Sequence, residues 1–275
     1  MSLSSAAALS PFKGFPALPS AVGPGRRPHT FHMRLAVLSD IHSNLEAFEA
    51  VLSLIDRLGV DELLCLGDVV GYNADPNACV HMLRSLAART VMGNHDARVA
   101  GLDDTSRFNP PAAEAVAWTR SVITEENASF LRGLPAEIAE DGDFVAVHGS
   151  PGDYDAYILG PSMAAESMEL VEDGGFRLCF FGHTHRPVAY VERGSGVETA
   201  TGRRVALGGG RTCMANPGSV GQPRDGDPRA SFLVYDRGEA VIEFFRVRYD
   251  VERAAAKVLA AGLPEAFASR LKGGW

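Results

Sequence analysis

Short apolar runs alternate with helical patterns over residues 34–92, and this alternation constrains the fold more than any other feature of the sequence. The runs at 34–39, 62–66 and 90–92 have the length and the Val and Leu content of buried strands. Between the first two, apolar side chains recur at spacings of three and four, at Leu45, Phe48, Leu52 and Ile55. Asn44 and Gly59 are expected to cap this helix at its two ends. A second helix is expected from Asp75-Pro76 to about residue 88. This order predicts parallel strands joined by right-handed crossovers.

The rest of the chain adds helices and hairpins. Helices are expected over 109–123, 124–134 and 162–172, and strands over 137–140, 144–148 and 177–181. Asp141-Gly142 is a strong hairpin signal between two of these strands. Short strands with Gly-rich turns follow residue 187, including 231–235 and 240–248, and a helical stretch covers 251–271. A parallel half followed by a hairpin-rich half predicts an α/β fold with two mixed sheets packed face to face and helices outside.

Composition and charge exclude several classes of protein. With 46% hydrophobic and 22% charged residues in 275, the chain has an average globular composition, and no apolar run is long enough to span a bilayer. The net charge of −8 disfavours binding of nucleic acid through its phosphates. The four cysteines show no C-x-x-C spacing, and Cys65 and Cys179 lie inside apolar runs. We therefore expect buried thiols and a cytoplasmic location, with neither a disulfide scaffold nor a zinc ribbon.

Residues 1–32 differ from the rest of the chain. They are rich in Pro, Gly and Ser, contain no Asp or Glu, and show no helical or strand periodicity. Such a segment buries too little apolar surface to offset its ordering entropy, so a disordered tail is expected. A secretory signal fits poorly because no basic residue precedes the weak apolar run 6–9, which Pro11 interrupts. A leader added for expression and an over-extended gene start are both open, since Met33 directly precedes the first predicted strand. The folded domain is expected over 33–275.

Five short polar motifs each follow a predicted strand. They are Asp40-Ile41-His42, Gly67-Asp68, Gly93-Asn94-His95-Asp96, Val147-His148-Gly149 and Gly182-His183-Thr184-His185. The carboxyl ends of strands are where open α/β sheets bind ligands. Five of the eight histidines in the chain belong to these motifs, so the motifs are the candidate functional residues.

The residue types in these motifs indicate a metal site. Asp40 and His42, like His183 and His185, are separated by one residue, and in extended chain such pairs point the same way and can converge on one centre. Carboxylate, amide oxygen and imidazole together suit a divalent cation of Mn, Fe, Ni, Co or Zn. Taken singly, an Asp-x-His is commonly coincidence or a local hydrogen bond, and Gly-Asn-His-Asp is commonly a turn with a capping aspartate. The ordered occurrence of all five motifs makes a purely structural explanation poor.

This ordered set of motifs resembles that of the calcineurin-like metallophosphoesterase superfamily, and the resemblance extends from Met33 to about Arg248. It implies a four-layer α/β/β/α sandwich with a two-metal site at its top edge. The ligands that it implies are Asp40, His42 and His185 for the first ion, Asn94, His148 and His183 for the second, and Asp68 as a bridge between them. His95 would be the catalytic acid. Asp96 would either orient His95 through a hydrogen bond or serve the fold alone.

The resemblance also implies hydrolysis of a small phosphate ester. Two divalent cations, with Mn expected, would lower the pKa of a bridging water and hold the phosphate oxygens. The resulting hydroxide would attack phosphorus, and His95 would protonate the leaving oxygen. A nuclease is disfavoured by the charge, and the oligomeric state is open. A catalytically silent metal-binding scaffold is disfavoured because all seven ligands and His95 are present.

Two departures separate the chain from the protein phosphatases of this superfamily. Met92 stands where those enzymes carry an arginine, and Val69-Val70-Gly71-Tyr72 stands where they carry Asp-Arg-Gly. Asp75-Pro76-Asn77 and Asn216-Pro217-Gly218-Ser219 instead resemble the small bacterial and archaeal phosphoesterases. Because the missing arginine would clamp a dianion, phosphodiesters are the expected substrates. A phosphomonoesterase or nucleotide phosphatase is the alternative.

Some residues near the motifs have open roles. Arg186, Arg224 and Arg229 are either phosphate contacts or surface arginines. Asn216 is expected to lie in a structural turn under the site, and a substrate contact is the alternative. Residues 153–159 are a candidate rim or lid, in which Tyr154 would either stack on a base or pack in the core.

Overall fold

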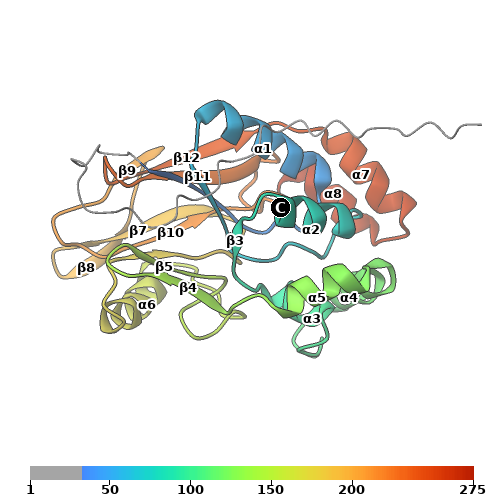
Figure 1. The fold of residues 1–275 in the computed structure, drawn as a ribbon, viewed down its shortest axis with the longest axis horizontal. Coiled ribbons are helices and arrows are strands. Elements are labelled where there is room, and N and C mark those ends of the chain that lie inside the picture. The colour runs from blue at the N-terminus through green and yellow to red at the C-terminus, as the bar shows by residue number, and fades with distance from the viewer. Residues whose placement is uncertain (1–32) are drawn as a thin grey trace, which may run out of the picture. The chain divides into compact units, whose positions relative to one another are not determined.

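The computed structural model describes residues 33–275, so the tail expected over 1–32 lies outside the described residues. The described residues form two mixed six-stranded sheets flanked by helices, as the predicted α/β/β/α sandwich requires (Figure 1). Across the first sheet the order is β3 (Arg89–Thr90), β2 (Glu62–Cys65), β1 (Arg34–Leu38), β11 (Ala230–Asp236), β12 (Val241–Val247) and β9 (Arg204–Ala206). Across the second it is β4 (Glu137–Glu140), β5 (Phe144–Val147), β6 (Leu178–Phe180), β10 (Cys213–Pro217), β7 (Pro187–Arg193) and β8 (Gly196–Thr199).

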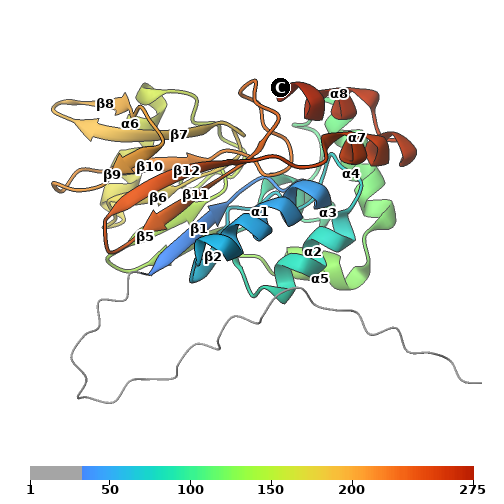
Figure 2. The same cartoon turned by 90° about the horizontal axis from the view of Figure 1, so that it is seen from above.

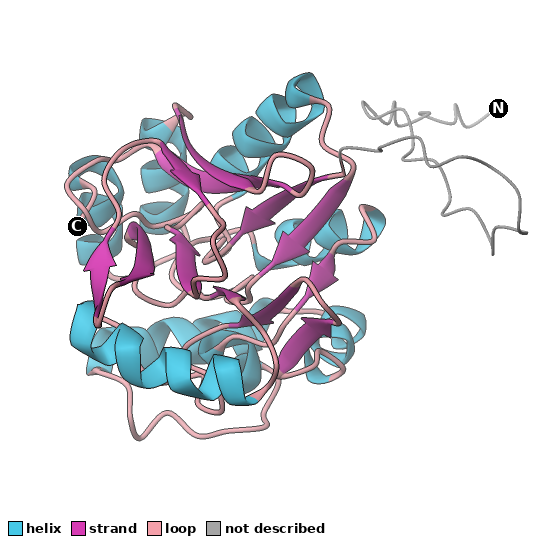
Figure 3. Cartoon of the chain, turned by 90° about the vertical axis from the view of Figure 1, so that its left-hand side faces the viewer, coloured by secondary structure: helices cyan, strands magenta, loops and turns pink. Residues whose placement is uncertain are grey.

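The helices lie outside the sheets and beyond one end of the strands. They are α1 (Leu45–Leu58), α2 (Pro76–Ser85), α3 (Asn94–Val99), α4 (Pro110–Val122), α5 (Glu125–Arg132), α6 (Pro161–Asp173), α7 (Val251–Ala260) and α8 (Glu265–Gly273). Helix α1 packs against β11 and β12 of the first sheet, and α6 packs against β7, β8 and β10 of the second. The strands are thus layered between helices, as the end-on view in Figure 3 shows. None of the helices in 33–275 is both long and apolar enough to cross a membrane.

The main core lies between the two sheets. Leu35, Val37 and Leu64 contribute to it from the first sheet, and Phe144 and Phe180 from the second. The alternate residues of the second sheet point the other way, and Val145, Val147 and Cys179 pack there against Ala164, Met168 and Val171 of α6. Strands buried on both faces appear in a sequence as continuous apolar runs, which is why these segments were recognisable.

The ends of α1 are set by the residues that the sequence indicated. The Asn44 side chain accepts a hydrogen bond from the Ala47 backbone N–H at 3.1 Å. Gly59 follows the helix in the left-handed conformation, with φ of 63°, which glycine adopts at little cost. Both predicted caps are confirmed.

Four elements differ from the sequence expectation. Strand β3 is Arg89–Thr90 and not 90–92, because the Met92 N–H already bonds to the Pro135 carbonyl outside the sheet. Helix α2 ends at Ser85, and Ala87 takes a positive φ of 49°. The C-terminal helix is two helices, α7 and α8, because Gly262 (φ 72°) and Pro264 interrupt it. Helix α3, which begins inside the Gly-Asn-His-Asp motif, was not predicted.

The topology brings the five motifs to one end of the two sheets. Strands β1, β2 and β3 are parallel to one another, and so are β5 and β6. Each of these five strands is followed by one motif. Figure 2 shows α2, α3, α4, α7 and α8 gathered at one end of the strands.

Candidate metal centre

Sharp turns, not extended chain, present the motif side chains. Asp40, His42, Asp68, His183 and His185 all have positive φ, between 48° and 66°. Residues other than glycine adopt this conformation at a cost, and such residues cluster at functional sites. The prediction that each i, i+2 pair converges from extended chain is therefore wrong in its geometry. Asp40 and His42 do meet, whereas His183 and His185 belong to two different groups of side chains.

The first group consists of Asp40, His42 and His185, all fully buried or nearly so. The Nε2 atoms of His42 and His185 lie 3.1 Å apart. Asp40 Oδ1 lies 3.7 Å from His42 Nε2 and 3.3 Å from His185 Nε2. This oxygen has no hydrogen-bond partner in the described part of the chain. A buried carboxylate oxygen without a hydrogen bond, facing two imidazole nitrogens, fits a bound cation.

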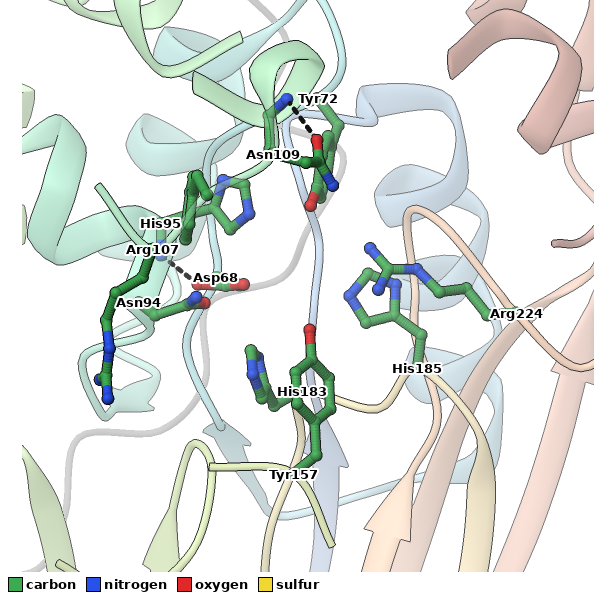
Figure 4. Close-up of a pocket in the computed structure, with 12 residues that line it drawn as sticks. Asp68, Tyr72, Asn94, His95, Arg107, Asn109, Tyr157, His183, His185 and Arg224 are labelled. Atoms are coloured by element: carbon green, nitrogen blue, oxygen red, sulfur yellow. Dashed lines mark hydrogen bonds between the residues drawn. The ribbon is translucent and has the colours of Figure 1, made fainter. Parts of the chain in front are cut away.

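The second group consists of Asp68, His148 and His183, with Asn94 beside them. Asp68 Oδ2 lies 3.4 Å from His148 Nε2 and also 3.5 Å from His42 Nε2 in the first group. One carboxylate oxygen therefore lies between the two groups. The Oδ1 atom of Asn94 and Nε2 of His148 are buried and lack hydrogen-bond partners among residues 33–275. The donors in this group fit a second cation, and Figure 4 shows Asp68, Asn94 and His183 around the pocket.

Backbone carbonyls fix which ring nitrogen of each histidine faces the site. The Nδ1 atoms of His42, His148 and His185 lie 3.0, 2.7 and 2.6 Å from the carbonyl oxygens of Val70, Leu66 and Gln222, respectively. A carbonyl only accepts, so Nδ1 carries a proton and Nε2 faces the site, where it can offer its lone pair to a cation. His183 is reversed: its Nε2 bonds to the Asp155 carbonyl at 3.2 Å, which leaves Nδ1 free. This arrangement is typical of histidines that bind metal.

Burial and mutual charge set the ionisation of these groups. Burial lowers the pKa of His42 well below its usual value and the pKa of His183 to about 3. Burial also opposes charge on His148, but the carboxylate of Asp68 raises the pKa of His148 to about 9. Burial would raise the pKa of Asp68, yet the charge of His148 holds it well below the usual range. A cation binding here would displace the His148 proton and take its place as the partner of Asp68.

The His95 ring packs against two aromatic side chains. Its ring centroid is 4.4 Å from that of Tyr72 and 4.5 Å from that of Phe108. A Cβ atom at Gly71 would lie 2.5 Å from His95 Nδ1, so the ring needs glycine there. Burial lowers the pKa of His95 to about 4, and the charge of Arg224 contributes in the same direction. Its ring is therefore neutral at pH 7 before a substrate binds.

Asp96 serves the backbone and does not contact His95 through a hydrogen bond. Its Oδ1 accepts from the Val70 N–H at 3.2 Å and its Oδ2 from the Gly93 N–H at 3.1 Å. Of the two roles left open for Asp96, the geometry supports the structural one. Its carboxylate ties the loop after β2 to the start of α3, and so holds Asp68 and Asn94 on adjacent turns.

A small pocket opens above the two groups, with a volume of about 90 Å³. Ligand pockets for drug-sized molecules are several times larger, at about 300–1,000 Å³. Besides the motif residues, its walls contain Tyr72, Arg107, Phe108, Asn109, Ala112, Tyr157 and Arg224. Figure 4 shows Arg224 across the pocket from His95 and Asn94. The pocket is therefore of a size for a small chemical group and not for a drug-sized molecule.

The structure distinguishes the three arginines whose roles the sequence left open by their distance from the pocket and their partners. Arg224 lines the pocket, and its guanidinium carbon lies 5.6 Å from the centroid of the Tyr72 ring. Arg186 donates to the Arg224 carbonyl, and Arg229 pairs with Asp227 at 2.6 Å. Neither Arg186 nor Arg229 belongs to the residues that line this pocket.

The structure also shows the contacts of the rim tyrosines and of Asn216. The Tyr154 hydroxyl bonds to Asp103 at 3.1 Å, while Tyr157 stacks on His183 with ring centroids 3.9 Å apart. Tyr157, and not Tyr154, is therefore the aromatic residue of the predicted rim that lines the pocket. Asn216 lies in strand β10 and not in a turn, but it donates to the Gly182 carbonyl at 2.6 Å and so supports the turn that carries His183.

Sequence reasoning did not single out several residues that line or support the pocket. They are Arg98, Arg107, Phe108, Asn109, Asp155 and Tyr157. Two of them, Asp155 and Tyr157, lie in the predicted rim segment. The others follow the Gly-Asn-His-Asp motif, and only the packing of α3 against α4 brings that segment over the site.

Comparisons with known proteins agree with this fold. Residues 33–239 match the family model of the calcineurin-like phosphoesterase superfamily domain. Uncharacterized protein MJ0912 of Methanocaldococcus jannaschii is 39% identical over 241 residues, which cover 86% of this chain and 96% of that protein. Phosphodiesterase YfcE of Escherichia coli K12 is 28% identical over 214 residues, which cover 74% of this chain and 88% of YfcE. The crystal structure of a metallophosphoesterase from Sphaerobacter thermophilus matches with a TM-score of 0.77 at 38% identity, covering 88% of this chain and 99% of that one.

The family match and these relatives identify a phosphate ester hydrolase of a metal-dependent family. The chain belongs to the calcineurin-like phosphoesterase superfamily.

Proposed function

We propose that this protein hydrolyses a small phosphate ester at a dinuclear metal centre. Asp40, His42 and His185 would hold one ion, Asn94, His148 and His183 the other, and Asp68 would bridge them. The observation that carries the proposal is the position of Asp68 Oδ2, which lies within 3.5 Å of one histidine nitrogen from each group. The ligand set of oxygen and imidazole nitrogen suits Mn²⁺ and also Fe, Ni, Co or Zn.

Two cations in these positions would lower the pKa of a water molecule and neutralise charge on the phosphate. The chain itself supplies the proton for the leaving group. His95 faces the pocket from α3, and Tyr72 and Phe108 hold its ring in place. The negative charge of a bound phosphate opposes the effect of burial and favours the protonated ring. His95 would then donate this proton to the leaving oxygen.

Two classes of substrate are supported by different observations. Phosphodiesters are favoured by Met92, which replaces the arginine of the protein phosphatases, and one relative carries the name phosphodiesterase. Phosphomonoesters are favoured by Arg224, which brings a guanidinium into the pocket opposite His95 and Asn94 (Figure 4). Among the described residues, no carboxylate lies within ion-pair distance of Arg224, whose Nη2 instead contacts the Gln222 amide oxygen at 2.8 Å. Its charge is therefore available to a phosphate.

All four cysteines are buried and free, which supports a reducing compartment such as the cytoplasm.

Activity against a matrix of metals and substrates tests the proposal. The protein is stripped with EDTA, then loaded with Mn²⁺, Fe²⁺, Co²⁺, Ni²⁺ or Zn²⁺. Each form is assayed with bis-nitrophenyl phosphate, mononitrophenyl phosphate and phosphopeptides. We expect activity only with metal, and two ions per chain in the active form. Activity that persists at a metal content near zero would contradict the dinuclear proposal.

A further inference from the structure

Asp155, in the rim segment after β5, contacts two of the side chains assigned to the second ion. Its Oδ1 accepts a hydrogen bond from Asn94 Nδ2 at 3.0 Å. Its backbone carbonyl accepts from His183 Nε2 at 3.2 Å. Asn94 and His183 follow strands of different sheets, so one residue of the rim ties the two together.

These two contacts orient the atoms that would bind metal. A carboxylate only accepts, so the amide nitrogen of Asn94 must face Asp155, and its Oδ1 then points to the site. The same logic applies to His183, whose Nε2 proton on the Asp155 carbonyl leaves the Nδ1 lone pair free. Asn94 Oδ1 is buried without a hydrogen-bond partner in the described part of the chain, as expected of an atom reserved for a cation.

Two arginines hold the Asp155 carboxylate in place. Arg98 is fully buried, and its two terminal nitrogens lie 3.1 and 2.9 Å from the two oxygens of Asp155. The more exposed Arg107 adds a contact of 3.1 Å from the rim of the pocket. The Asp155 carboxylate is therefore fixed by contacts with two guanidinium groups.

The backbone of the rim segment is fixed as well. Ser150 and Asp153 exchange two backbone hydrogen bonds of 2.9 and 3.0 Å. The Asp155 N–H donates to Asp153 Oδ1 at 2.8 Å. The segment folds back over Gly149, where a Cβ atom would lie 2.6 Å from the Asp153 carbonyl oxygen. Asp155 is thus held from both its side chain and its main chain.

We propose that Asp155 is a positioning residue for the second metal ion, which it serves by orienting Asn94 and His183. The inference rests on the proposed dinuclear centre. It predicts a selective effect, because Asp155 contacts neither Asp40 nor His42 nor His185 in the first group. Loss of a partner that orients metal ligands typically weakens metal binding by about 10–100-fold.

The test uses Asp155→Asn and Asp155→Glu in the full chain, with Asp103→Asn as the matched control. Asp103 also contacts Arg98, at 3.3 Å, but it does not contact Asn94. The Asn variant removes the negative charge at residue 155. The Glu variant keeps a negative charge as a partner for Arg98 but displaces the carboxylate. The Glu variant therefore keeps the test informative if the Asn variant does not fold. Thermal unfolding checks the fold of each. Mn²⁺ binding is measured by calorimetric titration, metal content after dialysis, and the electron paramagnetic resonance signal of coupled Mn²⁺ ions.

We expect the wild type and Asp103→Asn to bind two ions and to show the coupled signal. In the Asp155 variants one ion should bind about 10–100-fold more weakly while the other changes less than about threefold, and the coupled signal should give way to that of isolated Mn²⁺. A folded Asp155 variant that binds both ions like the wild type would overturn this inference alone. A wild type that binds fewer than two ions would overturn the dinuclear proposal and the inference with it.

Discussion

Replacing Arg224 by glutamine should separate the two substrate classes. Arg224 is half-buried in the wall of the pocket, opposite His95, and within residues 33–275 it has no carboxylate partner. A phosphomonoester dianion carries one more negative charge than a diester. We therefore expect Arg224→Gln to slow hydrolysis of the monoester much more than hydrolysis of the diester.

The size of the effect follows from the contacts of the guanidinium. A hydrogen bond to a charged group contributes about 1.5–3 kcal/mol. The Nε and Nη2 atoms of Arg224 already face Gln222 Oε1, at 3.3 and 2.8 Å, and solvent reaches the side chain, so the lower part of this range applies. About 1.5–2 kcal/mol corresponds to a loss of about 10–30-fold in kcat/KM, at ~1.4 kcal/mol for each factor of ten. For the diester we expect a loss of less than about threefold, because the extra charge is absent.

The assay compares kcat/KM for mononitrophenyl phosphate and bis-nitrophenyl phosphate at equal Mn²⁺ and pH. Arg229→Gln is the matched control, since Arg229 pairs with Asp227 outside the pocket and should affect neither substrate. Metal content is measured in each variant to exclude an effect through the ions. Equal losses on the two esters, or no loss on the monoester, would refute the assignment of Arg224 to the extra charge.

Four further predictions concern the centre itself. EDTA should abolish activity and lower the melting temperature, and Mn²⁺ should restore both. An ion present at a free concentration of 100 times its Kd stabilises the fold by about 2.7 kcal/mol. An unchanged melting temperature after complete removal of metal would contradict a buried site. Asp68→Ala should lose at least one ion per chain by metal analysis, because this residue faces both groups, and full occupancy would argue against a bridge. His95→Ala should keep its metal but react about 10²–10⁴-fold more slowly, with a smaller defect for nitrophenolate than for alkoxide leaving groups; an equal defect across leaving groups would indicate positioning instead. Bis-nitrophenyl phosphate should be hydrolysed faster than phosphoserine or phosphothreonine peptides, and the reverse preference would reject the diester class.

Local patterns determined much of the fold because the interactions behind them are local. Asn44 and Gly59 cap α1 through contacts within a few residues, and any context would show the same signal. The apolar runs of β1, β2, β5 and β6 reflect burial on both faces. The residue types of the five motifs likewise indicate a metal site, because the affinity of a carboxylate or an imidazole for a cation belongs to the side chain itself.

Tertiary structure decided how the motif residues are used. His183 and His185 are separated by only one residue, yet with positive φ angles they belong to different groups, which spacing alone does not reveal. Likewise, the site-facing nitrogens of His42 and His148 depend on the carbonyls of Val70 and Leu66, which lie 28 and 82 residues away along the chain.

The order of the strands shows the same division between local and long-range information. The sequence suggests a parallel half and a hairpin-rich half, but β11, β12 and β9 from the second half complete the first sheet. Asp155 and Arg98, separated by 57 residues, meet only because the rim segment lies against α3. Sequence patterns record each residue's own burial and turn preference. Partners distant in the chain are selected by packing, so the contacts that orient Asn94 and His183 were set by the tertiary structure.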